Sequence, residues 1–273
     1  MIRPDVVIEL ESGDVLLTVH PDHGGRLGTL EVGGRPILQD DPTRGSMLWG
    51  CYPMAPWAGR VRHGRFHFSG REERLATNLA PHAIHGTVFE VEWEVVDAGR
   101  DHCELATPLG WQFGGTAHQH VHLGPDGVVC VLTVHASERP MPAVIGWHPC
   151  FLRPMQHDLD FARMYRRDHE GITLPELVDP APHPWDDCFV GPEGPLRLHH
   201  PDLVVTISSD CDHWVVFDEL DDIVCVEPQS GPPDAFNMSG ALGGAELLRP
   251  GDLLQRHLTI SWRRNVSGHL PEK

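Results

Sequence analysis

Short runs in which apolar and polar residues alternate recur along the whole 273-residue chain. An alternation with a period of two places the apolar side chains on one face of a β-strand, so each run predicts a strand that is buried on one side. The clearest runs lie at residues 14–20, 65–68, 88–96, 127–135, 203–208, 213–217 and 257–262. We therefore expect an all-β fold, either a sandwich or a barrel.

The connections between these runs are rich in turn residues. The 28 glycines and 25 prolines suit many tight turns and disfavour long helices. The sequence GPDG at residues 124–127 lies between two runs and predicts a hairpin. Residues 160–167 (DFARMYRR) suggest one short helix. The proline-rich residues 175–184 are interpreted as a long loop inside a single domain spanning residues 1–273, because the strand pattern continues on both sides.

Charge and composition exclude several classes of function. A formal net charge of -18, from 39 acidic and 21 basic residues, repels nucleic-acid phosphates and anionic membranes. The 7 cysteines are odd in number and include no CxxC pair, which predicts neither a disulfide framework nor a cysteine zinc site. The N-terminal MIRPDVVIELESGD lacks the apolar stretch of a secretory signal, and no apolar run is long enough to span a bilayer. We expect a cytoplasmic protein that binds neither nucleic acid nor membranes.

Two segments in the first third of the chain contain candidate ligand-binding residues. In PMAPWAGRVRHGRF, residues 53–66, Trp57 offers an aromatic face of the kind that stacks on a sugar ring, and Arg60 offers a rigid fork of donors for hydroxyl oxygens. In NLAPHAIHGTVFE, residues 78–90, His82 and His85 lie near a glycine that lets the backbone approach another group closely. An arginine in an ordinary ion pair and a structural loop histidine are the alternative interpretations.

Two later segments contain a candidate acid and a candidate base. In IGWHPCF, residues 145–151, His148 has apolar neighbours, and burial disfavours the histidine cation so that the group exchanges protons near neutral pH. In VCVEPQSGPPDAFN, residues 224–237, an apolar run ends with Glu227, which is costly to bury unless it is paired or functional. Gln229 in the same segment suits a hydroxyl-rich ligand. A histidine in a core hydrogen bond and an ordinary polar turn are the alternatives.

A rival interpretation rests on HQHVH at residues 118–122. On a strand, His118, His120 and His122 point to one face, where three histidines are a common ligand set for zinc. Neighbours on one face of a strand lie roughly 6–7 Å apart, however, so three in a line do not easily surround one ion. We therefore predict no metal site here and keep a metal enzyme, such as a cupin-like protein, as the weaker alternative.

Taken together and in this order, the four segments resemble the aldose 1-epimerase (galactose mutarotase-like) family, from about Gly24 to Trp262. The motifs IGWHPCF and VEPQSGPPDAFN are similar to the family's histidine and glutamate motifs, and AIHG and PWAGRVRHGRF are supporting matches. The resemblance implies a single large antiparallel β-sandwich, the mutarotase-like supersandwich, with a site in a groove across one face. It also implies a small-molecule sugar as the substrate.

The resemblance implies a role for each candidate residue. His148 would be the general acid at the ring oxygen and Glu227 the general base at the anomeric hydroxyl, so that the sugar ring opens and recloses without a metal or nucleotide cofactor. Arg60 and His85 would hold substrate hydroxyls. The family's substrate-binding aspartate matches Asp186 in WDDCF, although the adjacent Asp187 leaves the register open by one residue.

The chain departs from the family's usual pattern at three positions in these segments. Gly59 stands where asparagine often precedes the arginine, Thr87 where a second glycine is frequent, and Cys150 where a tyrosine usually follows His-Pro. These departures leave the identity of the sugar open. One alternative is a hexose-6-phosphate 1-epimerase that binds phosphate through a cluster of arginines: Arg62, Arg65, Arg71 and Arg74. Another is a non-catalytic carbohydrate-binding or regulatory protein on the same fold.

Overall fold

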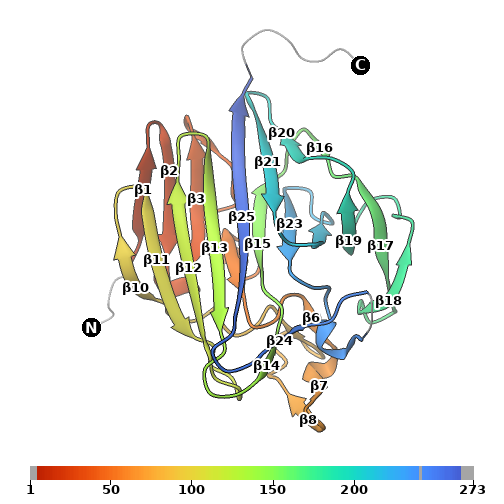
Figure 1. Ribbon diagram of the computed structural model, residues 1–273. Helices are drawn as coiled ribbons and strands as arrows, with labels where there is room; N and C mark the ends of the chain where they lie inside the picture. Colours follow the sequence, from red (N-terminus) through yellow and green to blue (C-terminus); the bar gives the residue numbers. More distant parts are fainter. Residues whose placement is uncertain (1–4, 240–241, 266–273) are drawn as a thin grey trace.

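Two large antiparallel sheets make up most of the molecule (Figure 1). The computed structural model describes residues 5–239 and 242–265. Within these residues the helical elements are single 3-10 turns: η1 (Pro21–His23), η2 (Pro42–Arg44), η3 (Arg62–Gly64) and η4 (Ala235–Asn237). The remaining regular structure is β-strand, so the expected all-β sandwich is confirmed.

The first sheet is 11-stranded within the described residues and includes the segments with the predicted acid and base. In spatial order its strands are β1 (Ile8–Ser12), β2 (Val15–His20), β3 (Arg26–Val32), β5 (Cys51–Met54), β15 (Gly146–Leu152), β23 (Ile223–Gln229), β22 (His213–Phe217), β19 (Asp186–Pro192), β17 (Phe161–Arg167) and β18 (Thr173–Val178), and β4 (Arg35–Pro36) pairs with β3. Strands far apart in the sequence, β5, β15 and β23, are therefore neighbours at its centre.

The second sheet is 8-stranded and packs face to face with the first. Its strands, in spatial order, are β10 (Glu94–Ala98), β11 (His102–Pro108), β12 (Thr116–Leu123), β13 (Gly127–His135), β25 (Leu253–Arg264), β21 (Leu203–Ser209), β20 (Leu196–His199) and β16 (Gln156–Asp158). Three short pairs extend from the sandwich: β14 (Met141–Ala143) with β24 (Glu246–Leu248), β6 (Arg60–Val61) with β9 (Ala83–Ile84), and β7 (Arg65–Phe68) with β8 (Arg71–Arg74).

The main hydrophobic core fills the space between the two sheets. Leu17 and Leu30 enter it from the first sheet, and Val121, Leu132 and Leu258 enter it from the second, all fully buried. Along β12 and β13 buried and exposed residues alternate, as the period of two requires of strands with one face in the core. The alternation in the sequence therefore sets which face of each strand packs inward.

Most of the predicted strands are confirmed. The runs at residues 65–68, 127–135 and 213–217 coincide with β7, β13 and β22, and those at 14–20, 203–208 and 257–262 correspond to β2, β21 and β25. The predicted hairpin joins β12 to β13, with the Gly124 amide donating to the Gly127 carbonyl oxygen over 2.8 Å. Here the local pattern and the turn residues agree with the tertiary structure.

The short helix expected at residues 160–167 is wrong, because this segment forms β17. Strand β17 pairs with β18 on one side and with β19 on the other. Phe161 and Tyr165 are buried there. Hydrogen bonding to strands on both sides outweighs the weak helical tendency of the sequence.

Two further expectations are corrected in part. Only the end of the run at residues 88–96 is a strand, β10, because the Gly24 amide bonds the Val91 carbonyl and the Trp93 amide bonds the Pro21 carbonyl, which ties this segment to the η1 turn. The loop expected at residues 175–184 is partly strand, since β18 includes Pro175. That strand ends the order of the sheet, where a missing amide donor is tolerated.

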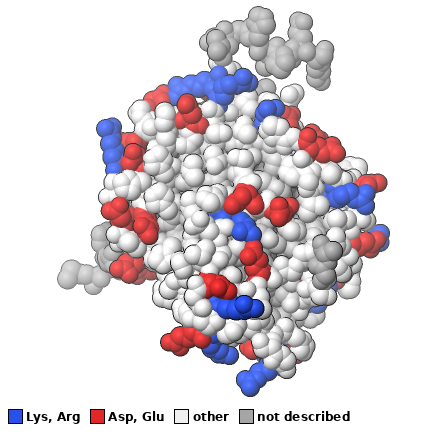
Figure 2. All heavy atoms as spheres, in the orientation of Figure 1, with Lys and Arg blue, Asp and Glu red and all other residues white. Residues whose placement is uncertain are grey.

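Charged side chains of both signs lie interspersed over the face shown in Figure 2, with arginines in small groups beside aspartates and glutamates. Among the described residues, no helix combines the length and the apolar character needed to cross a membrane.

Candidate functional site

Strands β15 and β23 divide their side chains between the two faces of the first sheet. In IGWHPCF, Trp147 and Phe151 are fully buried in the core between the sheets, so His148 and Cys150 lie on the opposite face. The antiparallel register pairs Gly146 with Gln229 and Cys150 with Cys225, so that residues 147–149 of β15 lie beside residues 226–228 of β23. The sandwich therefore presents a row of polar residues on the face of the first sheet that turns away from the core, which we call the site face.

His148 and Glu227 meet on the site face. The Nε2 atom of His148 lies 3.1 Å from Oε1 of Glu227, and the two side chains are 8% and 3% exposed. The imidazole ring stacks on Tyr52 of β5, with 4.7 Å between the ring centroids and 11° between the planes. The residues predicted as acid and base, 79 positions apart in the sequence, thus form one buried ion pair on adjacent strands.

Burial and mutual attraction shift both groups. Burial opposes the cation of His148, but the Glu227 carboxylate and the adjacent Cys150 outweigh it and raise the pKa of His148 to about 9. Burial raises the pKa of Glu227 to about 7, and the His148 cation limits that rise. Between these values the pair consists of an imidazolium and a carboxylate, which is a proton donor facing a proton acceptor.

His85 packs edge-on against His148 from the loop after β9, with 5.0 Å between ring centroids. Its backbone has a φ of 59°, in the left-handed region, and its amide donates to the Gly59 carbonyl oxygen over 3.1 Å. Burial, then the positive charges of His148 and Arg60, hold the pKa of His85 well below its ordinary value. The ring is therefore neutral, and its Nδ1 has no hydrogen-bond partner among the described residues.

Arg60 lies at the start of β6 and its Nη2 is 3.2 Å from Oδ2 of Asp186. Arg167 contacts the same oxygen through Nη1 at 2.8 Å and binds Oδ1 of Asp187 through Nε at 2.8 Å. Of the two neighbouring aspartates, Asp186 is therefore the one that contacts Arg60. Burial raises the pKa of Asp187, and the Arg167 guanidinium opposes that rise.

Gln229 adds an amide to the same face. Its Nε2 donates to Oε2 of Glu227 over 3.1 Å, while its Oε1 is buried with no partner among the described residues. Trp57, the predicted stacking surface, is only 3% exposed and packs in the main core with Trp111 and Phe236. Because so little of the indole is exposed, Trp57 offers a sugar little surface for stacking.

Two residues of this region, Tyr52 and Arg167, are not predicted by the sequence motifs. Tyr52 is one of 2 tyrosines in the chain, but it lies within an apolar run, where nothing in the sequence distinguishes it from a core residue. Arg167 ends β17, the segment that we expected to be helical, so its strand face was not assigned. Reading residues 161–167 as a strand beside β19 would have pointed to it.

Three groups among the described residues bring potential metal ligands within 4.8 Å of one another: His85, His148 and Glu227; His148, Cys150 and Cys225; and His157, His183 and Asp218. His118, His120 and His122 belong to none of these groups. They lie on β12, on the face of the second sheet that turns away from the core. Glu104 lies 3.8 Å from Nδ1 of His118, but within the described residues no three ligand atoms converge around the HQHVH motif.

Comparison with known proteins places the chain in a family. A family model for aldose 1-epimerase matches residues 6–261. An uncharacterized protein of Escherichia coli K12, YphB, is 26% identical over 94% of this chain and 99% of its own length. Both alignments include the segments that contain His148 and Glu227.

Solved structures share the fold over nearly the full length. A putative aldose 1-epimerase from Escherichia coli K12 superposes with a TM-score of 0.86 at 22% identity, covering 96% of this chain and 100% of that one. A galactose mutarotase-like protein from Clostridium acetobutylicum gives a TM-score of 0.84 at 16% identity, covering 96% and 98%. A galactose 1-epimerase from Lactobacillus acidophilus gives 0.79 at 15% identity, covering 97% and 98%. The predicted mutarotase-like sandwich is thereby confirmed.

Proposed function

The chain belongs to the aldose 1-epimerase family, and from this premise we propose that it interconverts the α and β anomers of a free aldose by acid–base ring opening and closure. The observation that carries the proposal is the buried contact between His148 and Glu227. Mutarotation needs one proton removed from the C1 hydroxyl and one delivered to the ring oxygen, and a facing acid and base are sufficient for both transfers.

In the proposed reaction the Glu227 carboxylate takes the proton of the C1 hydroxyl while the His148 imidazolium protonates the ring oxygen. The bond between C1 and the ring oxygen breaks, and the sugar becomes an open-chain aldehyde. Rotation about the C1–C2 bond followed by the reverse transfers closes the other anomer, and both protein groups return to their starting states. A substrate that enters between the two groups replaces their direct contact with two hydrogen bonds of its own.

The neighbouring side chains suit a ligand covered with hydroxyl groups. Gln229 and His85 each have a buried polar atom with no partner among the described residues, and a sugar hydroxyl would supply one. Arg60 and Asp186 add donors and acceptors of opposite charge at one edge. We propose that these four residues orient the substrate, so that C1 and the ring oxygen meet Glu227 and His148.

A sugar phosphate is the less favoured substrate. Of the arginines that suggested it, Arg62 binds Asp168 at 2.6 Å and Glu170 at 2.8 Å, and Arg74 binds Glu72 at 2.9 Å. Guanidinium groups already neutralised by carboxylates offer a phosphate little net attraction. A free aldose is therefore the proposed substrate class.

Polarimetry on freshly dissolved α-glucose, α-galactose and other aldoses tests the proposal. We expect the optical rotation to reach its equilibrium value at a rate proportional to protein concentration. A Glu104→Gln variant is the matched control, because this carboxylate is 41% exposed on β11 of the second sheet and should not affect the rate.

Two other outcomes would contradict the proposal. Sugar binding without any acceleration of anomer exchange would favour the non-catalytic carbohydrate-binding alternative. Faster turnover of glucose 6-phosphate than of every free aldose would favour the hexose-6-phosphate alternative.

A further inference from the structure

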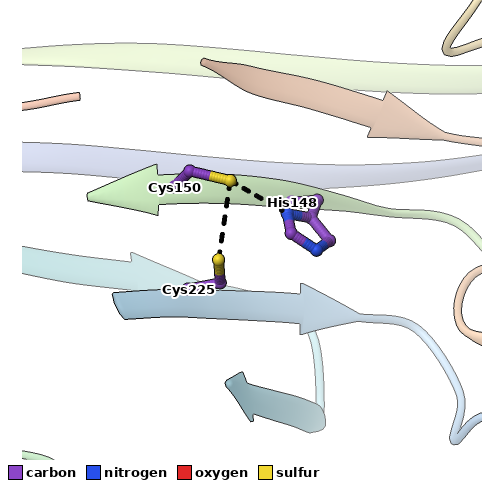
Figure 3. Close-up of side chains that lie close together, drawn as sticks. All are labelled: His148, Cys150 and Cys225. Atoms are coloured by element: carbon purple, nitrogen blue, oxygen red, sulfur yellow. Dashed lines mark hydrogen bonds between the residues drawn. The ribbon is translucent and has the colours of Figure 1, made fainter. Parts of the chain in front are cut away.

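Beneath the proposed acid lies a cluster that the sequence spacing did not indicate. Nδ1 of His148, the ring nitrogen that faces away from Glu227, lies 3.5 Å from Sγ of Cys150. That sulfur lies 3.5 Å from Sγ of Cys225. Figure 3 shows the imidazole and the two thiols pointing toward one another, with His148 and Cys150 on one strand and Cys225 on its neighbour. One nitrogen and two sulfurs thus converge from β15 and β23.

The strand pairing explains why the two sulfurs are so close. Cys150 and Cys225 are direct partners in the register. The Cys150 amide donates to the Gly50 carbonyl oxygen, and its carbonyl oxygen accepts from the Gln39 amide, so both groups point away from β23. The two cysteines therefore form a non-hydrogen-bonded pair, the kind in which opposing side chains approach most closely.

The dimensions of the cluster match those of a tetrahedral zinc site. Zn–S bonds of about 2.3 Å and Zn–N bonds of about 2.0–2.1 Å place tetrahedral donor atoms about 3.6–3.8 Å apart. The two distances of 3.5 Å are close to these values, and the three donor atoms all lie within 4.8 Å of one another. Two thiolates and one imidazole are also a ligand set that zinc prefers.

The hydrogen bonding of His148 is that of a metal ligand. A histidine that binds a metal through one ring nitrogen almost always donates its other N–H to a carboxylate or a carbonyl, which fixes the tautomer. Here Nε2 of His148 faces Glu227 at 3.1 Å and Nδ1 faces the sulfurs. The contact that makes the pair an acid and a base therefore also orients Nδ1 toward the thiols.

We propose that His148, Cys150 and Cys225 bind Zn²⁺ through Nδ1 and the two Sγ atoms. The cation displaces the proton on Nδ1 of the His148 imidazolium and the protons of the thiols, which are released to solvent. The fourth position is left for a water molecule or for the Met47 carbonyl oxygen, which lies 3.6 Å from Sγ of Cys150. Half-buried Leu48, Phe217 and Leu220 cover the cluster on the site face. Cys150 stands where a tyrosine usually follows His-Pro in the family, so a family member with that tyrosine would lack one of the three proposed ligands.

The proposed site has a consequence for catalysis, which rests on the proposed function. With Zn²⁺ on Nδ1, the imidazole keeps only the proton on Nε2 and no longer becomes an imidazolium. Giving up that proton would leave an imidazolate, so the ring is a far weaker acid than the imidazolium that the reaction needs. Bound Zn²⁺ therefore inhibits anomer exchange.

Cobalt and zinc titrations of the reduced full-length protein, without substrate, test the site. Co²⁺ bound by two thiolates and an imidazole gives a sulfur-to-metal charge-transfer band in the near ultraviolet and intense visible bands of tetrahedral cobalt. We expect both, together with displacement by one equivalent of Zn²⁺ and a Zn²⁺-dependent rise in Tm. Cys225→Ser should lose the charge-transfer band and the rise in Tm. Cys211→Ser is the matched control, a buried cysteine outside every ligand group among the described residues, and should keep both.

Two results would overturn the proposed site. Cobalt bound without a charge-transfer band would come from histidines alone, of which the chain has 20. A disulfide between Cys150 and Cys225 that persists in reductant would leave no thiolates to bind the cation.

Polarimetry then tests the consequence separately. Zn²⁺ should inhibit the parent protein and Cys211→Ser, and it should not inhibit Cys225→Ser. If the cation binds with thiolate character but turnover is unchanged, the inhibitory consequence is wrong although the site stands. If no aldose is turned over at all, the proposed function is wrong and the binding result is unaffected.

Discussion

The two faces of β15 and β23 carry different kinds of side chain, apolar on the core face and titratable on the site face. The core face carries Trp147 and Val226, which are fully buried in the main hydrophobic cluster between the sheets. The site face carries His148 and Glu227, which are nearly as buried but titratable and paired with each other. Successive residues of one strand thus alternate between stabilising the sandwich and forming the site.

This difference separates stability from function at the level of single residues. Side chains on the core face stabilise the fold by removing apolar surface from water. A buried ion pair contributes little net stability, because the cost of desolvating two charges offsets their attraction. The site face is therefore better explained by chemistry than by packing, and changes at adjacent positions of one strand test that distinction.

The largest expected effect is on turnover. Glu227→Gln and His148→Asn each remove one of the two proton-transfer groups and should lower kcat by a factor of about 10²–10⁴. Both replacements keep a polar side chain of similar shape, so circular dichroism should show an unchanged fold. The measurement is polarimetry beside thermal unfolding. Full activity in either variant would exclude its proposed role.

The second effect is on stability, one residue away from the base. Val226→Ala deletes two methyl groups from the core face of β23 and should lower the free energy of unfolding by about 2–3 kcal/mol, from lost burial and the cavity that remains. Chemical denaturation measures this change. Turnover per folded molecule should stay close to that of the parent protein. A loss of turnover as large as that of Glu227→Gln would show that the two faces are not separable.

The third effect is the dependence of kcat/KM on pH. The reaction needs Glu227 ionised, which is favoured above a pKa of about 7, and His148 protonated, which is favoured below a pKa of about 9. The rate should therefore rise through pH 7, stay highest between the two values and fall through pH 9.

The same two groups should make the free energy of unfolding fall as pH rises. The pKa of Glu227 is raised on folding from 4.5 to about 7, and that of His148 from 6.5 to about 9. The folded state therefore binds more protons than the unfolded state within each of these two pH ranges, and raising the pH favours unfolding.

The fourth effect concerns substrate affinity at the edge of the site. Asp186→Asn weakens contacts with both Arg60 and Arg167, so it should raise KM by about tenfold, the equivalent of one charged hydrogen bond, and change kcat less. Asp14→Asn is the matched control, because it also breaks an arginine contact, to Arg264 at 2.6 Å, but on an exposed surface. An equal change in both variants would argue against a role for Asp186 in binding.

The sequence predicts the fold better than it predicts the site. Strands β13 and β22 are predicted to the residue. Buried positions recur at every second residue along most of β13, and β22 is a short, almost continuously buried run. Strand β17 was missed because its pairing with β18 and β19 decides its structure and leaves little local signal. The strands without a local pattern are determined by pairing between segments far apart in the sequence, which no single segment encodes.

The same limit applies to the site. The segments containing His148 and Glu227 were found from their motifs, but their registration on adjacent strands depends on the whole sheet. The position of Cys225 opposite Cys150 has the same origin. These two cysteines are 75 positions apart, so their spacing could not suggest a ligand pair.

The smallest effect is expected on the outer face of the second sheet, the counterpart of the site face. His118, His120 and His122 lie there on β12, half-buried or exposed, and in none of the ligand groups found among the described residues. Replacing all three by glutamine should change the free energy of unfolding by no more than about 0.5 kcal/mol, as is usual for surface substitutions, and leave turnover unchanged. Thermal unfolding and polarimetry measure both, in buffer with and without a chelator. A loss of activity in this triple variant, matched by a loss in the parent protein on chelation, would revive the metal-enzyme interpretation and remove His148 and Glu227 from the centre of the chemistry.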